Sequence, residues 1–132
     1  MIGLDANVLV RYIMQDDAKR SPKATKIIEA LDGVENNGYV ALASIIELAW
    51  VLATSYELTR AQVVQALDSL VRAKQLKIES ADQVKQALRI FKIGKSDFAD
   101  CLIERSANGA GCEKTIRFDV NSSKYAGMTL IR

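Results

Sequence analysis

Acidic residues are the side chains of this sequence whose types and spacing could support chemistry. The 132-residue chain contains no histidine, which excludes a Ser-His-Asp triad, a Cys-His dyad and a zinc site with histidine ligands. Acid–base or metal chemistry must therefore rest mainly on carboxylates. Clustered carboxylates repel one another, and their pKa values rise unless a cation compensates the charge. An oxygen-only ligand set suits Mg²⁺ or Mn²⁺, and such an ion promotes phosphodiester hydrolysis by polarising the phosphate and activating water.

Short apolar runs that alternate with helical patterns must position these acids. The apolar runs predict five strands, over residues 1–5, 39–43, 76–79, 113–118 and 128–131. Apolar residues at helical spacing predict helices between them, over residues 7–15, 21–33, 44–56, 80–91 and from 59 and 96 onward. Because strands and helices alternate, we expect one α/β domain over residues 1–132, with a mostly parallel sheet and helices on both faces.

Several of the expected helices begin at residues that favour a helix N-terminus. Ser21 precedes Pro22, and Ser96 precedes another helical pattern, so both are predicted N-caps. Residues 44–47 and 59–62 have the form of a capping box, with Ser or Thr followed three residues later by Glu or Gln.

The topology predicts that several acids meet at one edge of the sheet. Asp5 ends the first strand and Asp119 ends the fourth, and the carboxyl ends of parallel strands are where ligands bind in such sheets. Glu47 lies in the first turn after the second strand. Asp97 and Asp100 share roughly one face of the helix that starts near Ser96, and Glu104 follows four residues after Asp100.

Each acid also has an alternative role that is purely structural. Asp5 is a good N-cap for the next helix, and Glu47 fits the acid of a capping box. Asp97 and Asp100 suit the first turn of a helix because of its dipole, and Asp119 suits an Asx-turn. Four acids at strand tips in a chain without histidine favour a shared site over four separate structural roles.

The ordered acidic motifs resemble those of PIN-domain nucleases, and the chain is closest in character to the VapC-type toxins of prokaryotic toxin–antitoxin pairs. The residues that carry the resemblance are Leu4-Asp5-Ala6-Asn7, Ser44-Ile45-Ile46-Glu47, Asp97-Phe98-Ala99-Asp100 and Phe118-Asp119. The resemblance implies a PIN-like three-layer α/β/α fold with a five-stranded parallel sheet in the order 3-2-1-4-5.

The resemblance also implies an activity and a set of site residues. It implies an endoribonuclease that depends on Mg²⁺ or Mn²⁺, a cognate antitoxin protein that covers the acidic pocket, and a homodimer. The implied catalytic and metal-binding acids are Asp5, Glu47, Asp100 and Asp119. Candidates for residues around them are Asn7, Asp97 and Glu104.

Two arginines are candidate contacts for RNA phosphate. Arg117 lies two residues before Asp119, where family members often have Thr or Ser, so it either contacts a phosphate or pairs with an acid. Arg11 lies about one helical turn after Asn7. The alternative for both is a solvated surface charge.

Two other functions remain open at this point. A catalytically silent RNA- or protein-binding domain would have no reason to keep a repulsive acid cluster. A phosphatase or phospho-acceptor module with Asp5 as nucleophile resembles a DxD pattern, in which Asn7 here replaces the second acid.

Composition indicates a cytoplasmic protein. The net charge of +2 and pI of about 8.6 permit RNA binding. No signal peptide or membrane span is predicted, and Cys101 and Cys112 suit reduced, structural cysteines.

The first two predicted helices each carry an apolar stripe, which suits either the core or a groove for a partner. The residues of the stripes are Val8, Leu9 and Tyr12, then Ala24, Ile27, Ile28 and Leu31.

Overall fold

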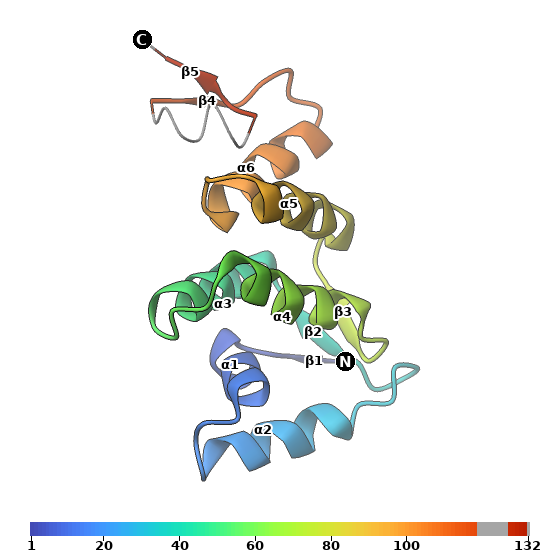
Figure 1. The fold of residues 1–132 in the computed structure, drawn as a ribbon. Helices are drawn as coiled ribbons and strands as arrows, with labels where there is room; N and C mark the ends of the chain where they lie inside the picture. Colours follow the sequence, from blue (N-terminus) through green and yellow to red (C-terminus); the bar gives the residue numbers. More distant parts are fainter. Residues whose placement is uncertain (119–126, 132) are drawn as a thin grey trace. The chain divides into compact units, whose positions relative to one another are not determined.

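A computed structural model describes residues 1–118 and 127–131 of the chain (Figure 1). It divides into two compact units, Met1–Glu79 and Ser80–Arg132. Asp119 and the turn expected over residues 121–125 lie outside the described residues. No helix in the described ranges is long and apolar enough to cross a membrane.

The first unit contains a parallel three-stranded sheet. Its strands are β1 (Ile2–Gly3), β2 (Gly38–Val40) and β3 (Leu76–Ile78), in the order β1-β2-β3. Gly38 opens the central strand, and a Cβ atom there would lie 2.7 Å from a Leu4 methyl and 3.0 Å from methyls of Leu31 and Leu76. Glycine at this position therefore lets three leucine side chains close over the start of the strand.

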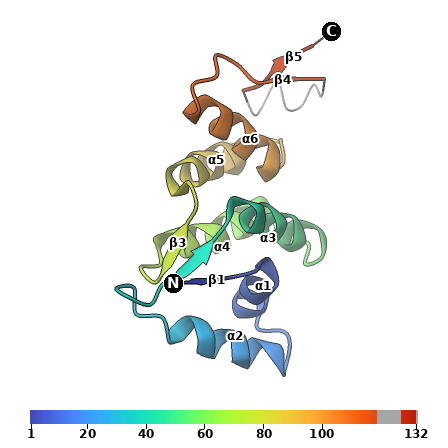
Figure 2. The ribbon, with the colours of Figure 1, turned by 180° about the vertical axis from the view of Figure 1, so that it is seen from behind.

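Four helices pack around these strands. They are α1 (Ala6–Met14), α2 (Arg20–Glu29), α3 (Leu42–Thr54) and α4 (Arg60–Arg72). Helix α1 packs against α2 and α3, and α3 packs against α4 (Figure 2). Side chains that are almost completely buried form the core, namely Leu9, Ile28, Val40, Ile45, Leu48, Leu52, Val63 and Leu67. Burying one such side chain contributes about 1.5–3 kcal/mol.

The second unit contains two helices and a short parallel sheet. Helices α5 (Ala81–Ile93) and α6 (Phe98–Gly109) pack on each other, and the rings of Phe91 and Phe98 meet edge to face at 6.0 Å. Strands β4 (Ile116–Arg117) and β5 (Thr129–Leu130) run parallel.

The observed strand pairs agree with the predicted sheet as far as they extend. The chain is α/β, with parallel strands in both units, and the neighbours within each sheet are those of the order 3-2-1 and 4-5. The pairing of β1 with β4, the three-layer arrangement and the single domain over 1–132 stay predictions. The strands are shorter than expected; β2 stops at Val40, for example, because α3 begins at Leu42.

One predicted capping box is confirmed and the other is wrong. Thr59 Oγ1 accepts the Gln62 N–H at 3.2 Å, while the Thr59 N–H donates to Gln62 Oε1 at 2.9 Å. Ser44 does not cap α3, because that helix begins two residues earlier with Ala41 as N-cap. The Leu42 N–H at its start donates instead to the Glu79 carboxylate at 2.9 Å.

The caps predicted at Ser21 and Ser96 are also wrong, and acids replace both serines. Ser21 is buried inside α2, and Asp17 Oδ1 accepts the N–H groups of Lys19 and Arg20 at 3.0 and 2.7 Å. Asp97 takes the N-cap of α6, one residue after the predicted position. A carboxylate beside a helix N-terminus also interacts favourably with the helix dipole, which a serine does not.

Candidate active site

Asp5 lies at the junction between β1 and α1. The Leu4 N–H donates to the Tyr39 carbonyl at 2.8 Å, so strand pairing continues to the residue before Asp5. Asp5 is the N-cap residue of α1, and its carbonyl accepts the Val8 N–H at 3.1 Å, but its side chain accepts no capping hydrogen bond. Asp5 therefore occupies the N-cap position that its structural alternative predicted, but its exposed carboxylate makes no capping bond.

Glu47 projects from α3 beyond the helix start and is exposed. Because α3 begins at Leu42, Glu47 is too far along the helix to complete a capping box. Glu47 and Asp5 line the same cavity, with a volume of about 550 Å³. Within residues 1–118 and 127–131, no hydrogen bond or ion pair engages either carboxylate.

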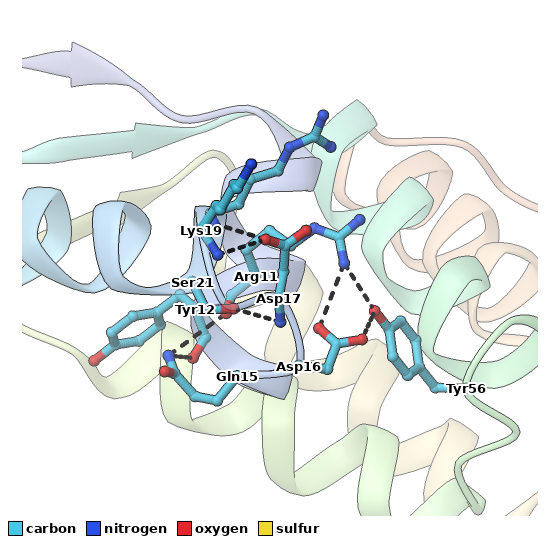
Figure 3. Close-up of polar contacts among 9 residues, drawn as sticks. Arg11, Tyr12, Gln15, Asp16, Asp17, Lys19, Ser21 and Tyr56 are labelled. Carbon is cyan, nitrogen blue, oxygen red and sulfur yellow. Dashed lines mark hydrogen bonds and ion pairs between the residues drawn. The ribbon is translucent and has the colours of Figure 1, made fainter.

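Arg11 borders this cavity and is held by two partners. Its Nη1 atom lies 3.4 Å from Asp16 Oδ1 and 3.4 Å from the Tyr56 hydroxyl oxygen. The Tyr56 hydroxyl donates to Asp16 Oδ2 at 2.7 Å, so the side chains of Arg11, Asp16 and Tyr56 all contact one another (Figure 3). Tyr56 itself lines the cavity. The hydroxyl bond lowers the pKa of Asp16 from its usual 3.8 and raises that of Tyr56 from its usual 10.0.

In the second unit, Asp97 and Asp100 have structural partners. Asp97 Oδ1 accepts the Asp100 N–H at 2.8 Å, so Asp97 has the capping role that was its alternative. Arg117 donates to Asp100 Oδ1 at 2.6 Å, with side chains that are 33% and 13% exposed. Of the two roles predicted for Arg117, pairing with an acid is the one observed.

Glu104 is also engaged. It is 8% exposed and binds the guanidinium of its neighbour Arg105 through both oxygens, at 2.5 and 2.8 Å. This hydrogen bonding raises the pKa of Arg105. The Glu104 charge is therefore compensated inside the second unit.

A comparison with known protein families matches residues 2–128 to the PIN domain. The chain belongs to the PIN domain family. It is also similar to a protein from Aquifex aeolicus named VapC ribonuclease, with 21% identity over 127 residues that cover 96% of this chain and 93% of the relative. These findings confirm the resemblance carried by the acidic motifs.

The structure of this PIN domain groups the predicted site residues into two sets. Asp5, Asn7, Glu47 and Arg11 line one cavity of the first unit. Asp97, Asp100 and Arg117 are linked by hydrogen bonds in the second unit. Within either unit, the described residues include no group of three or more acid or cysteine side chains arranged to hold a metal ion. That the two sets meet, with Asp119, stays a prediction.

The first cavity of this PIN domain nevertheless fits a hard divalent cation. Such ions prefer carboxylate oxygen and water, and often take only one or two protein carboxylates. Asp5 and Glu47 supply two carboxylates that face water and have no competing partner in the described residues. Asp100 differs, since a cation there would compete with Arg117.

Sequence reasoning missed the contribution of Asp16 and Tyr56 to this site. The two residues are forty positions apart and come together only through the packing of α1 against α3. Asp16 directly follows the helix predicted over residues 7–15, and no local pattern around Asp16 or Tyr56 indicates that the two side chains pair. The signal in the sequence was Arg11 itself, a cation predicted on the first helix near Asn7, whose side chain is 24% exposed in the structure.

Proposed function

We propose that this PIN domain is a Mg²⁺- or Mn²⁺-dependent endoribonuclease that hydrolyses RNA phosphodiester bonds. The observation that carries the proposal is the cavity shared by Asp5 and Glu47, whose carboxylates have no partner in the described chain. Carboxylates that share a cavity repel one another when both are charged, and a bound cation compensates that charge. The family membership and the ribonuclease name of the Aquifex aeolicus relative support RNA as the substrate.

The site residues would have different roles in catalysis. Asp5 and Glu47 would hold the ion, and Asp100 and Asp119 would complete its ligand set, as the family motifs imply. When bound, the ion polarises the phosphate and lowers the pKa of the attacking water. Asn7 lies beside Asp5 in the same cavity and offers an amide that donates to a phosphate oxygen or to that water.

Arg11 orients the RNA phosphate in this proposal. A guanidinium matches the geometry of phosphate oxygens, and its charge offsets the negative charge that develops in the transition state. Asp16 and Tyr56 fix Arg11 on one side and leave it on the border of the cavity. Preorganisation of this kind lowers the entropy lost when the substrate binds.

We further propose that the protein is the toxin of a type II toxin–antitoxin module. A cognate antitoxin would cover the acidic cavity and block cleavage of cytoplasmic RNA, and the toxin would act as a homodimer. The name VapC of the relative and the acidic motifs of the chain support this assignment.

The two alternative functions explain less of the cavity. A silent RNA-binding domain would place two uncompensated carboxylates against RNA phosphates, which repel them. A phosphatase with Asp5 as nucleophile would lack the second acid of its motif, since Asn7 occupies that position.

The test is cleavage of a pool of structured, end-labelled RNAs by purified, partner-free protein with Mn²⁺, Mg²⁺ or a chelator. Asp5→Asn should reduce metal-dependent cleavage by about a thousandfold, because the ion loses a ligand that supports several kcal/mol of transition-state stabilisation.

Asp82→Asn is the matched control, because Asp82 is an exposed acid in the first turn of α5 and lies outside the cavity. It should cleave like the wild type. Cleavage that persists in chelator or in Asp5→Asn would contradict the proposal.

A further inference from the structure

A second cavity, of about 240 Å³, lies between α1 and α2 beside Asp5. It shares three residues with the acidic cavity, namely Asp5, Asn7 and Arg11. The two cavities therefore form neighbouring compartments on either side of one group of side chains. A ligand with repeating units could extend from one compartment into the other.

The second cavity is rich in positive charge. Arg20 and Lys23 line it together with Arg11, and among the residues that the structure describes Asp5 is the one acid in its lining. Arg20 and Lys23 are three residues apart at the start of α2, so they lie on one face of that helix. In the described residues no ion pair engages either side chain. The Asp17 carboxylate accepts the backbone N–H groups of Arg20 and Lys19, and these bonds, with a smaller contribution from the Arg20 charge, lower the pKa of Asp17.

The remaining lining of the second cavity is apolar. Val8, Ala24 and Ile27 contribute to it, and Ile27 is 45% exposed although its neighbour Ile28 is 1% exposed. The sequence pattern placed Ile27 in the same apolar stripe as Ile28, but the structure leaves Ile27 facing this cavity. Positively charged side chains beside an apolar lining suit a ligand that has both a phosphate group and an apolar portion.

We propose that the second cavity binds the nucleotide next to the cleaved phosphate of a single-stranded RNA. Arg20 and Lys23 contact its phosphate, and Val8, Ala24 and Ile27 lie against its ribose and base. Arg11 stands between the two compartments and contacts the phosphate that is cleaved. This inference rests on the proposed function, because only an RNA held at Asp5 would continue into the second cavity.

The experiment compares the double variant Arg20→Ala/Lys23→Ala with the wild type and with Lys26→Ala. Lys26 is an exposed lysine on the same helix, but it does not line the cavity. Each protein is titrated against a fluorescein-labelled single-stranded RNA of random sequence at several salt concentrations in chelator. Cleavage of the same RNA with Mn²⁺ gives KM and kcat, and circular dichroism with thermal melting verifies the fold.

The double variant should bind RNA about tenfold more weakly at low salt, and its salt dependence should fall by about 0.7 in log–log slope for each lost phosphate contact. Its KM should rise while kcat at saturating RNA stays within about twofold of the wild type, because the phosphate contacts position the strand. Lys26→Ala should match the wild type.

A salt dependence and KM in the double variant equal to those of Lys26→Ala would overturn the inference. If RNA binding were unchanged but the double variant no longer bound a copurifying partner protein, the cavity would be a protein interface and the inference would also fail. Wild-type protein that cleaves no RNA with any metal would instead overturn the proposed function itself, so the two failures are distinguishable.

Discussion

The candidate site acids of the two units of this PIN domain differ in whether they have hydrogen-bond or ion-pair partners. In the first unit, Asp5 and Glu47 are exposed to one cavity and have no partner in the described residues. In the second unit, Asp97 binds a backbone N–H group, Asp100 binds Arg117, and Glu104 binds Arg105. Among the candidate site acids in the described residues, those of the first unit have no partner and those of the second unit each have one.

This difference indicates separate tasks for the two sets of acids. A carboxylate with a built-in partner contributes to the fold without a cation, whereas an uncompensated pair carries a repulsion that a cation relieves. In the proposed function, Asp5 and Glu47 of the first unit are therefore the primary cation ligands. A cation would engage Asp100 only if Arg117 gave up its hydrogen bond.

The largest expected contrast is between Glu47→Gln and Glu104→Gln. Glu47→Gln should reduce cleavage about a hundredfold or more, because the cation loses a ligand, while stability in chelator stays equal or rises slightly. Glu104→Gln should lower the free energy of unfolding by about 2 kcal/mol, because Arg105 loses its charged partner in a partly buried position. Cleavage assays and urea unfolding of both variants check the contrast. Equal effects of the two variants on cleavage would remove the distinction between the units.

A smaller effect is expected for Arg117→Thr, which removes the ion pair between Arg117 and Asp100. Without this competing cation the Asp100 carboxylate should bind the metal ion more readily, so the Mn²⁺ concentration for half-saturation should fall roughly fivefold, equivalent to about 1 kcal/mol for a partly exposed pair. Fluorescence of Trp50, the single tryptophan and an exposed residue on the same helix as Glu47, gives a binding signal independent of turnover. Arg72→Thr removes an exposed helical ion pair and serves as the control. An unchanged or weaker Mn²⁺ affinity in Arg117→Thr would show that Asp100 does not contact the cation.

The smallest effect concerns the pH dependence of the Tyr56–Asp16 hydrogen bond. The folded pKa of Asp16 lies below 3.8, so its stabilisation is present above that pH and is lost as pH falls through the lowered value. The folded pKa of Tyr56 lies above 10.0, so its stabilisation is present below that pH and is lost as pH rises through the raised value. The urea midpoint of Tyr56→Phe should therefore fall below that of the wild type between these limits, and the gap should close outside them. Tyr12→Phe is the control. A difference in urea midpoint between the wild type and Tyr56→Phe that did not change with pH would refute the assignment of this stabilisation to the Tyr56–Asp16 hydrogen bond.

Local sequence patterns predicted the parts of the fold that local chemistry determines. The apolar run before Asp5 forms a parallel strand followed at once by a helix, and Thr59 with Gln62 forms the expected capping box. Asp5 and Glu47 were placed at one edge from topology alone, and they line one cavity.

The failed predictions have two causes. The caps predicted at Ser21 and Ser96 failed because nearby acids, Asp17 and Asp97, bind the backbone at those helix starts, whereas other details depend on contacts between distant parts of the chain. Ser44 lies inside α3 because the helix begins at Leu42, where the distant Glu79 accepts the Leu42 N–H. The fixation of Arg11 depends on Tyr56, and the choice between two roles for Arg117 depends on the position of Asp100. Such pairs follow from tertiary packing, which neither propensity nor periodicity specifies.

Mn²⁺ binding to the purified protein tests the central claim most directly. Calorimetric titration should give the same affinity for the wild type and Asp82→Asn, and an affinity at least about tenfold weaker for Asp5→Asn and for Glu47→Gln. Folding of each variant is verified by thermal melting in chelator. Unchanged Mn²⁺ affinity in both cavity variants would contradict the claim that Asp5 and Glu47 form the cation site of this PIN domain.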